Sequence, residues 1–200
     1  MSYSPSIERL VAAFSRLPSV GRRTAERFVF YLLKSGKRDV AELTNALKKL
    51  IENVKSCDVC QDFSDQSPCR ICADKTRDAS TICVIAEPQD LQAIERTGEY
   101  HGLYHLLRGT IQPDDEESIN MLKVNELIGR LKDYKIGEII LALNHDLSGE
   151  TTMMFLEKKL KEANPQLTIT RLARGLPMGS DMQYADEITL GSALKHRTKS

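Results

Sequence analysis

No apolar run in the 200-residue chain is longer than six residues, from Phe28 to Leu33. A helix needs about 20 apolar residues to cross a bilayer, so no membrane span is expected. The first residues show neither a basic flank nor an apolar stretch, and they predict no secretory signal. The P-loop pattern Gly-x-x-x-x-Gly-Lys is also absent. We therefore expect an intracellular protein without membrane contact and without a P-loop nucleotide site.

Net charge is absent overall, because 28 basic side chains balance 28 acidic ones, but the distribution is uneven. Residues 1–56 carry 11 basic and 5 acidic side chains, a net charge of +6, and the remainder has a net charge of −6. A basic end joined to an acidic body predicts that the first part meets a polyanion such as nucleic acid. A set of ordinary solvated helix faces is the alternative that charge leaves open.

Residues 1–56 have the pattern of a small helical module. Apolar residues recur at helical spacing from Ile7 to Leu17, and Pro18 and Gly21 then interrupt the pattern. A second helix is expected to end near Gly36. A third is expected to begin with Asp39 as its capping residue and Glu42 completing a capping box.

Residues 57–72 contain two cysteine pairs, Cys57-x-x-Cys60 and Cys69-x-x-Cys72, separated by eight residues. Two such knuckles supply four thiolates in a tetrahedron, the geometry that structural zinc accepts. Disulfides are disfavoured in a reducing compartment, and an iron–sulfur cluster is a less common occupant of tight pairs. We predict one structural Zn²⁺ whose binding supplies the folding free energy of this short finger. Cys83 lies in a buried-strand pattern and is interpreted as a core residue.

Residues 80–174 alternate strand and helix signals, and residues 175–200 have the pattern of a loop, a short helix and a polar tail. Strands separated by helices predict a parallel sheet with helices on its faces. The fold class expected for the whole chain is therefore α+β with several modules. The predicted strands are 81–86, 138–143 and 167–172, and the intervening helices are 91–96, 124–131 and 151–160.

The turn between the first two helices is a candidate phosphate site. Free amides near Gly21 at a helix N-terminus attract anions, and Arg23 and Arg27 lie four apart on one face of that helix, with Arg22 flanking the turn. Such contacts recognise phosphate, so binding should be independent of sequence and sensitive to salt. The segment resembles the helix-hairpin-helix motif of DNA repair proteins, with Ser19 in place of its first glycine.

Acidic residues follow two of the predicted strands, at the edge where parallel α/β folds bind ligands. Glu87 follows the first strand, and Asp146 and Glu150 follow a later one. The pattern resembles the Toprim domain, whose carboxylates hold magnesium for phosphodiester chemistry. Asn144 replaces the first aspartate of the family's Asp-x-Asp pair, so we expect weak or absent Mg²⁺ binding and a domain that binds without cutting.

Tyrosine and histidine pairs near residue 100 are weaker candidates for a functional role. Tyr100 and Tyr104 are expected to pack and not to act as nucleophiles, because neither is placed convincingly for attack. His101 and His105 lie four apart in a glycine-rich segment where no helix is assured, which disfavours a metal role for the pair.

The order of these modules resembles the bacterial RecR family of recombination mediators over nearly the whole chain. Besides the motifs above, the resemblance is carried by three segments, Gly98–His105, Ala173–Gly179 and Tyr184–Leu190. It implies four parts: a helix-hairpin-helix region at 1–56, a four-cysteine zinc finger at 57–72, a Toprim domain at 80–174 and an oligomerisation segment at 175–200.

The resemblance also implies a function. Members of the family are not known as enzymes and act in recombinational repair with RecO and RecF, helping RecA displace single-strand-binding protein. They form ring-like homo-oligomers, often tetramers, that can surround DNA, which implies a cytoplasmic, nucleoid-associated location. Glu87 and Asp146 are then candidate contacts for a basic partner. The alternatives are a magnesium-dependent Toprim nuclease or topoisomerase-like enzyme and a zinc-finger adaptor without DNA contact.

Overall fold

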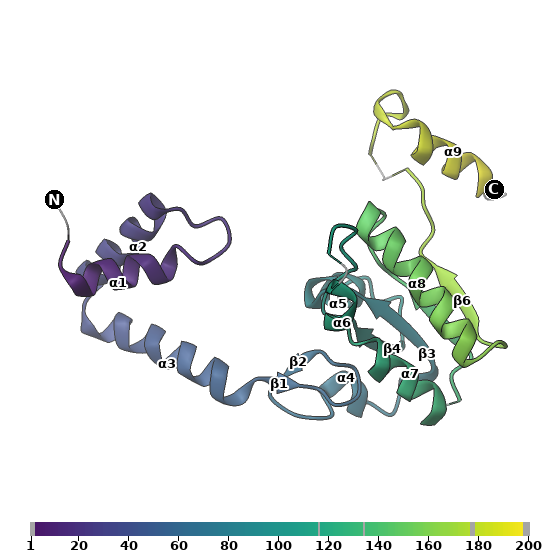
Figure 1. Ribbon diagram of the computed structural model, residues 1–200, viewed down its shortest axis with the longest axis horizontal. Coiled ribbons are helices and arrows are strands. Elements are labelled where there is room, and N and C mark those ends of the chain that lie inside the picture. Colours follow the sequence, from purple (N-terminus) through teal and green to yellow (C-terminus); the bar gives the residue numbers. More distant parts are fainter. Residues whose placement is uncertain (1–2, 116, 134, 177–178, 198–200) are drawn as a thin grey trace. The chain divides into compact units, whose positions relative to one another are not determined.

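A computed structural model describes residues 3–115, 117–133, 135–176 and 179–197 of the chain (Figure 1). The chain divides into two compact units, Met1–Val54 and Lys55–Ser200. Pro177 of the predicted late motif and the last three residues of the predicted segment 175–200 lie outside the described residues. Within the described part, no helix is both long and apolar enough to cross a membrane.

The first unit contains three helices, α1 (Pro5–Phe14), α2 (Arg22–Ser35) and α3 (Lys37–Asn53), which confirms the predicted helical module. Its buried core consists of Val11 on α1 and Ala25 and Val29 on α2. Helix α3 contributes no buried residue, although its sequence has an apolar stripe. The unit therefore has a small core and leaves much apolar surface on α3 exposed.

The start of α3 corrects one prediction. The helix begins at Lys37, with Gly36 at the N-cap and no side-chain capping bond, so Asp39 lies inside the first turn and does not cap it. Gly36 has a φ of 96°, a conformation that a residue without a Cβ adopts at little cost. The glycine turn thus sets where the helix begins, and Asp39 instead complements the helix dipole.

The second unit is built on a four-stranded parallel sheet in the order β4-β3-β5-β6. This confirms the predicted parallel α/β arrangement. It also adds a strand that the sequence did not predict, β4 (Gly102–Leu106), whose five residues are all buried. The other three strands are β3 (Asp78–Ile85), β5 (Glu138–Leu141) and β6 (Thr168–Arg171).

Several shorter elements complete this unit. A two-stranded antiparallel sheet of β1 (Lys55–Ser56) and β2 (Phe63–Ser64) precedes the main sheet together with helix α4 (Arg70–Ala73). The remaining elements are α5 (Pro88–Glu95), α6 (Ser118–Met121), α7 (Val124–Asp133), α8 (Leu147–Ala163), the 3₁₀ turn η1 (Met182–Tyr184) and α9 (Glu187–Lys195).

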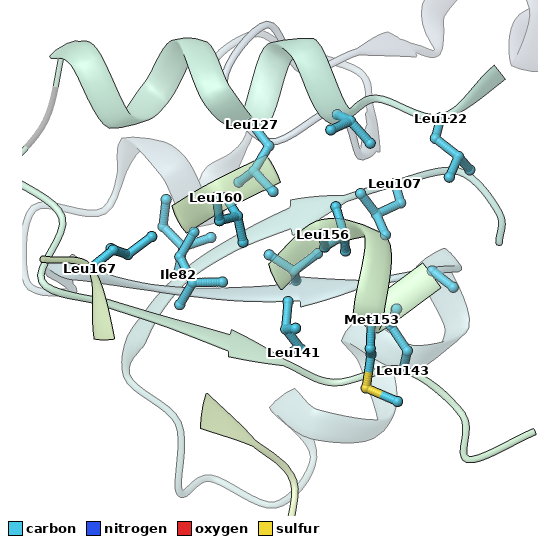
Figure 2. Packing of buried hydrophobic residues seen from close by; sticks show 14 of the residues in the cluster. Ile82, Leu107, Leu122, Leu127, Leu141, Leu143, Met153, Leu156, Leu160 and Leu167 are labelled. Carbon is cyan, nitrogen blue, oxygen red and sulfur yellow. The ribbon is translucent and has the colours of Figure 1, made fainter. Parts of the chain in front are cut away.

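The two faces of the sheet bury different sets of residues. Ile82 and Val84 of β3 belong to the larger core, where Leu127 of α7 and Leu156 of α8 also lie (Figure 2). The alternate residues of the strand belong to a second core that includes Leu91 of α5. Period-two alternation along β3 therefore assigns one face to α7 and α8 and the other to α5 and the cysteine segment.

His105 is a fully buried residue of β4. Its Nε2 lies 2.7 Å from the carbonyl oxygen of Lys123, and since a carbonyl only accepts, Nε2 carries the proton. The pKa of His105 is lowered to about 4, mainly by burial and also by the charge of Arg130, against the opposing effects of the Lys123 carbonyl and the charge of Glu126. His105 is therefore neutral in the folded protein at neutral pH.

We predict that this histidine makes the fold sensitive to mild acid. The unfolded chain has the ordinary imidazole pKa of 6.5, so between this value and about 4 the unfolded state binds more protons than the folded state. The contribution of His105 to the free energy of unfolding should be fully present above pH 6.5. It should fall as the pH is lowered, by up to about 1.4 kcal/mol per pH unit. Denaturant titrations in this range measure the slope. His105→Gln should flatten it, and an unchanged slope would assign the effect to other groups.

Candidate metal centre, acidic edge and helical hairpin

The four cysteines converge on one point. The sulfur atoms of Cys57, Cys60, Cys69 and Cys72 all lie within 4.8 Å of one another, and those of Cys60 and Cys69 are 3.7 Å apart. Zinc–sulfur bonds of about 2.3 Å in a tetrahedron place two sulfurs about 3.8 Å apart. The donor set and its spacing therefore fit Zn²⁺.

Local structure holds the two knuckles in place. Cys57 follows β1, and its backbone carbonyl accepts a hydrogen bond from the Gln61 amide at 2.9 Å, which closes the first knuckle. Cys69 is the N-cap residue of α4, and Cys72 lies within that helix. The Cys69 amide also donates to the Cys57 sulfur at 3.3 Å, which joins the two knuckles directly.

The sulfur atoms cannot all be charged without a cation. Hydrogen bonds from the thiols of Cys60 and Cys72 lower the pKa of Cys69, and the same contacts raise the pKa of both donors. These opposite shifts show that the sulfur atoms lie close enough to share protons. A divalent ion would allow the group to lose its protons together.

The cysteine segment packs directly on the sheet, which the sequence did not reveal. Cys57 and Cys60 lie in the same buried cluster as Cys83, Ile85 and Tyr104. The Leu106 amide of β4 donates to the carbonyl oxygen of Cys60 at 2.8 Å. The finger therefore packs against one face of the sheet and bonds to the backbone of its edge strand β4.

At the carboxyl edge of the sheet, Asp146 has a structural task. Its side chain caps α8 by accepting a hydrogen bond from the Gly149 amide at 2.7 Å. A Cβ atom on Gly149 would lie 1.9 Å from the carbonyl oxygen of Asn144, so this turn requires glycine. The glycine directly before Glu150 is thus explained by the close turn that starts α8.

Glu150 is held by positive charge from its own chain. Its carboxylate pairs with Arg171 at 3.0 Å, with His145 at 3.1 Å and with Arg174. Burial alone would raise the pKa of Glu150, but the hydrogen bond with His145 and the charges of both arginines hold it below its ordinary value. The carboxylate therefore already has its counter-ions.

The acidic residues predicted for this edge are not brought together as a metal group. Among the described residues, the four cysteines alone form a set of three or more metal-ligating side chains close enough to share one ion. Glu87 is exposed at the start of α5, where its amide donates to Asp90 at 3.0 Å. Glu87 and Asp146 are therefore exposed N-cap residues, of α5 and of α8, and Glu150 is an ion-paired carboxylate.

Tyr100 and Tyr104 pack as expected. The Tyr100 hydroxyl donates to the carbonyl oxygen of Leu103 at 2.7 Å and fills the space where a Cβ on Gly102 would lie. The Tyr104 hydroxyl donates to Glu95 at 2.7 Å, and burial raises the pKa of both phenols. These contacts give the segment Gly98–His105 a structural explanation.

The helical hairpin exposes the residues of the predicted DNA site. Ser19 adopts a φ of 63°, which corresponds to the glycine of the motif, and Gly21 is the N-cap of α2. Arg23 and Arg27 are exposed. Arg22 is also exposed, and it pairs with Glu8 and with Glu26, each at 3.0 Å, contacts that the sequence did not predict.

Family models match the chain in the order of these parts. The helix-hairpin-helix model of RecR matches residues 7–51, and the RecR zinc finger domain, which has four cysteine ligands, matches residues 54–74. The Toprim domain matches residues 80–173, and the RecR C-terminal model matches residues 175–198.

Similarity to known proteins extends over the full length. "Recombination protein RecR" of Bifidobacterium adolescentis is 45% identical, with 98% of each chain covered. The proteins of the same name from Moorella thermoacetica and Rubrobacter xylanophilus are 43% and 41% identical, again over 98% of each chain. The chain belongs to the RecR family.

Membership in the RecR family confirms the predicted resemblance and fold class. The zinc-finger match and the converging cysteines together support a structural zinc. The exact domain limits at 56, 72 and 174 stay predictions, as do the individual DNA-binding and acidic-edge residues.

We predict that removing one sulfur ligand destabilises the second unit and not only the finger. Cys60→Ser takes away a metal ligand inside the buried cluster that includes Ile85 and Tyr104. Zinc content should fall well below one per chain, and the melting temperature should drop by several degrees or more. Metal analysis and thermal denaturation measure the two effects. Cys83→Ser is the matched control and should keep its zinc; equal zinc loss in both variants would contradict the assignment.

Proposed function

We propose that this RecR-family chain is a DNA-binding mediator of recombinational repair that binds the sugar-phosphate backbone without sequence preference. The observation that carries the proposal is the exposed pair Arg23 and Arg27 on α2, next to the Gly21 turn. The first amides of a 14-residue helix and two guanidinium groups face solvent in this segment, which suits a phosphate backbone. Arg22 would act mainly by holding α1 to α2 through Glu8.

The finer part of the proposal comes from the family resemblance. The chain would act with RecO and RecF to help load RecA onto gapped DNA coated with single-strand-binding protein. A homo-oligomeric ring, with four chains as the expected number, would place several hairpins around one DNA. Residues 175–200 would contribute subunit contacts, and the exposed Glu87 would meet a basic partner. The cytoplasm and the nucleoid are the expected location.

We propose further that the Toprim domain does not cleave DNA and binds Mg²⁺ weakly or not at all. Asn144 brings no charge to the edge, Asp146 caps α8, and Glu150 is paired with two arginines. A carboxylate with counter-ions of its own gains less from a metal ion than a free one. The alternative, a magnesium-dependent nuclease or topoisomerase-like enzyme, is favoured by the Toprim match alone.

Charge reversal in the hairpin tests the DNA site. Arg23→Glu with Arg27→Glu should weaken binding about tenfold or more and reduce the salt slope of log K by about two for each hairpin engaged, because two phosphate contacts are lost. Fluorescence anisotropy with labelled DNA at several salt concentrations measures both. Lys34→Glu with Lys49→Glu makes the same change in net charge at exposed positions of the first unit and should have a smaller effect. Equal losses of DNA affinity in both double variants would mean that net charge alone, and not the hairpin, accounts for binding.

Incubation of supercoiled and single-stranded DNA with the purified protein and excess Mg²⁺ tests the second part. We expect no cleavage and no change in topology, because the edge carries no set of converging carboxylates among the described residues. Gel electrophoresis over several hours would detect even slow turnover. Cleavage that disappears in Glu87→Gln would establish the enzymatic alternative.

A further inference from the structure

Two residues of the second unit share an unusual backbone conformation. Gln61 has a φ of 65° and Arg108 a φ of 66°, in the left-handed region that residues with a Cβ rarely adopt. Such conformations persist where surrounding contacts hold them, and they are more frequent at active sites, ligand-binding sites and switch regions. Gln61 lies in the cysteine segment and Arg108 follows β4, yet the two residues touch each other.

The Arg108 side chain contacts three parts of the finger. Its Nε and Nη2 atoms donate to the Gln61 carbonyl oxygen at 3.1 and 2.9 Å, and Nη2 also donates to the Ser56 hydroxyl at 2.6 Å. Its guanidinium carbon lies 4.4 Å from the centre of the Phe63 ring. One side chain thus binds β1, the first cysteine knuckle and β2 together, and the planar fork of arginine makes this combination possible.

The backbone on either side of Arg108 belongs to the sheet. Before it, the Leu106 amide donates to Cys60 at 2.8 Å and the Leu107 amide to Ile85 at 2.9 Å. After it, the Gly109 amide donates to the carbonyl oxygen of Ala86 at 3.1 Å, directly before Glu87. Arg108 therefore lies between a cysteine ligand and the carboxyl edge of the sheet.

We infer that Arg108 is a positioning residue that couples the zinc centre to the carboxyl edge of the Toprim sheet. Zinc binding orders the knuckle that contains Cys60 and thereby fixes the position of the adjacent Gln61 carbonyl. Arg108 binds this carbonyl. Its left-handed backbone turns the chain so that Gly109 closes on Ala86. The finger thereby sets the position of Glu87. The inference rests on the structural zinc assigned to the four cysteines.

Zinc release and local amide exchange test this coupling in the full-length, zinc-loaded protein. Arg108→Ala removes the guanidinium but keeps a residue with a Cβ atom, so the left-handed backbone conformation is strained to a similar degree in both proteins. This variant should release zinc to the chromophoric chelator pyridylazoresorcinol about tenfold faster or more than the unmodified protein. The reason is the loss of the hydrogen bonds from the charged Arg108 side chain to Gln61 and Ser56. In hydrogen exchange, the amides of Leu107 and Gly109 should lose protection. The Ala142 amide, which donates to Val84 at 2.8 Å within the sheet, should keep its protection.

Two further variants separate the coupling from general stability. Arg108→Lys keeps a positive charge without the fork and should release zinc at an intermediate rate; it also replaces Arg108→Ala in the comparison if that variant does not fold. Arg96→Ala removes an exposed arginine that bonds within α5 and should behave like the unmodified protein.

The outcomes of this experiment are distinct. Zinc release at the unmodified rate in Arg108→Ala or Arg108→Lys, with protection intact at Gly109, would overturn the coupling and leave the structural zinc in place. An equal loss of protection at Ala142 and Gly109 would reduce Arg108 to a general stabilising residue and also overturn it. An unmodified protein that contains no zinc would overturn both the proposed metal and this inference.

Discussion

Four cysteine sulfurs within 4.8 Å of one another can all lose their protons only where a cation offsets the repulsion between the thiolates, and the second unit depends on this constraint. Cys57, Cys60 and Cys69 are buried in the cluster that also contains Ile85 and Tyr104 of the sheet. A tetrahedral ion would satisfy the sulfurs and fix both knuckles at once. The metal centre is therefore part of the hydrophobic core on one face of the Toprim sheet, and the other face is covered by α7 and α8.

The carboxyl edge of the sheet shows how an acidic constellation can serve structure. Asp146 directs its charge to the N-terminus of α8, and Glu150 pairs with Arg171 and Arg174. Both interactions stabilise the connections at this edge and lower the electrostatic gain from a bound cation. Glu87 and Asp146, unlike the half-buried Glu150, are exposed, which leaves these two residues accessible to another molecule.

The hairpin illustrates why net charge is a poor guide to a polyanion site. The chain as a whole is neutral, but 11 of its basic side chains lie in residues 1–56. The three arginines of α2 are all exposed, but Arg22 differs from Arg23 and Arg27 because it pairs with Glu8 and Glu26. The local arrangement of these guanidinium groups would decide which of them meets phosphate.

Features that depend on short-range spacing could be predicted from the residues alone. These are the three helices of the first unit, the cysteine knuckles, the parallel α/β pattern and the family. Strand β4 was not predicted, because the glycines in and around it are typical of a loop. The burial of both its faces is due to segments distant in the sequence. The tertiary structure likewise decided the contacts Arg22–Glu8, Glu150–Arg171 and Arg108–Gln61. In each, the two residues lie at least 14 positions apart in the sequence. Such contacts follow from how the chain closes on itself, and no local pattern records them.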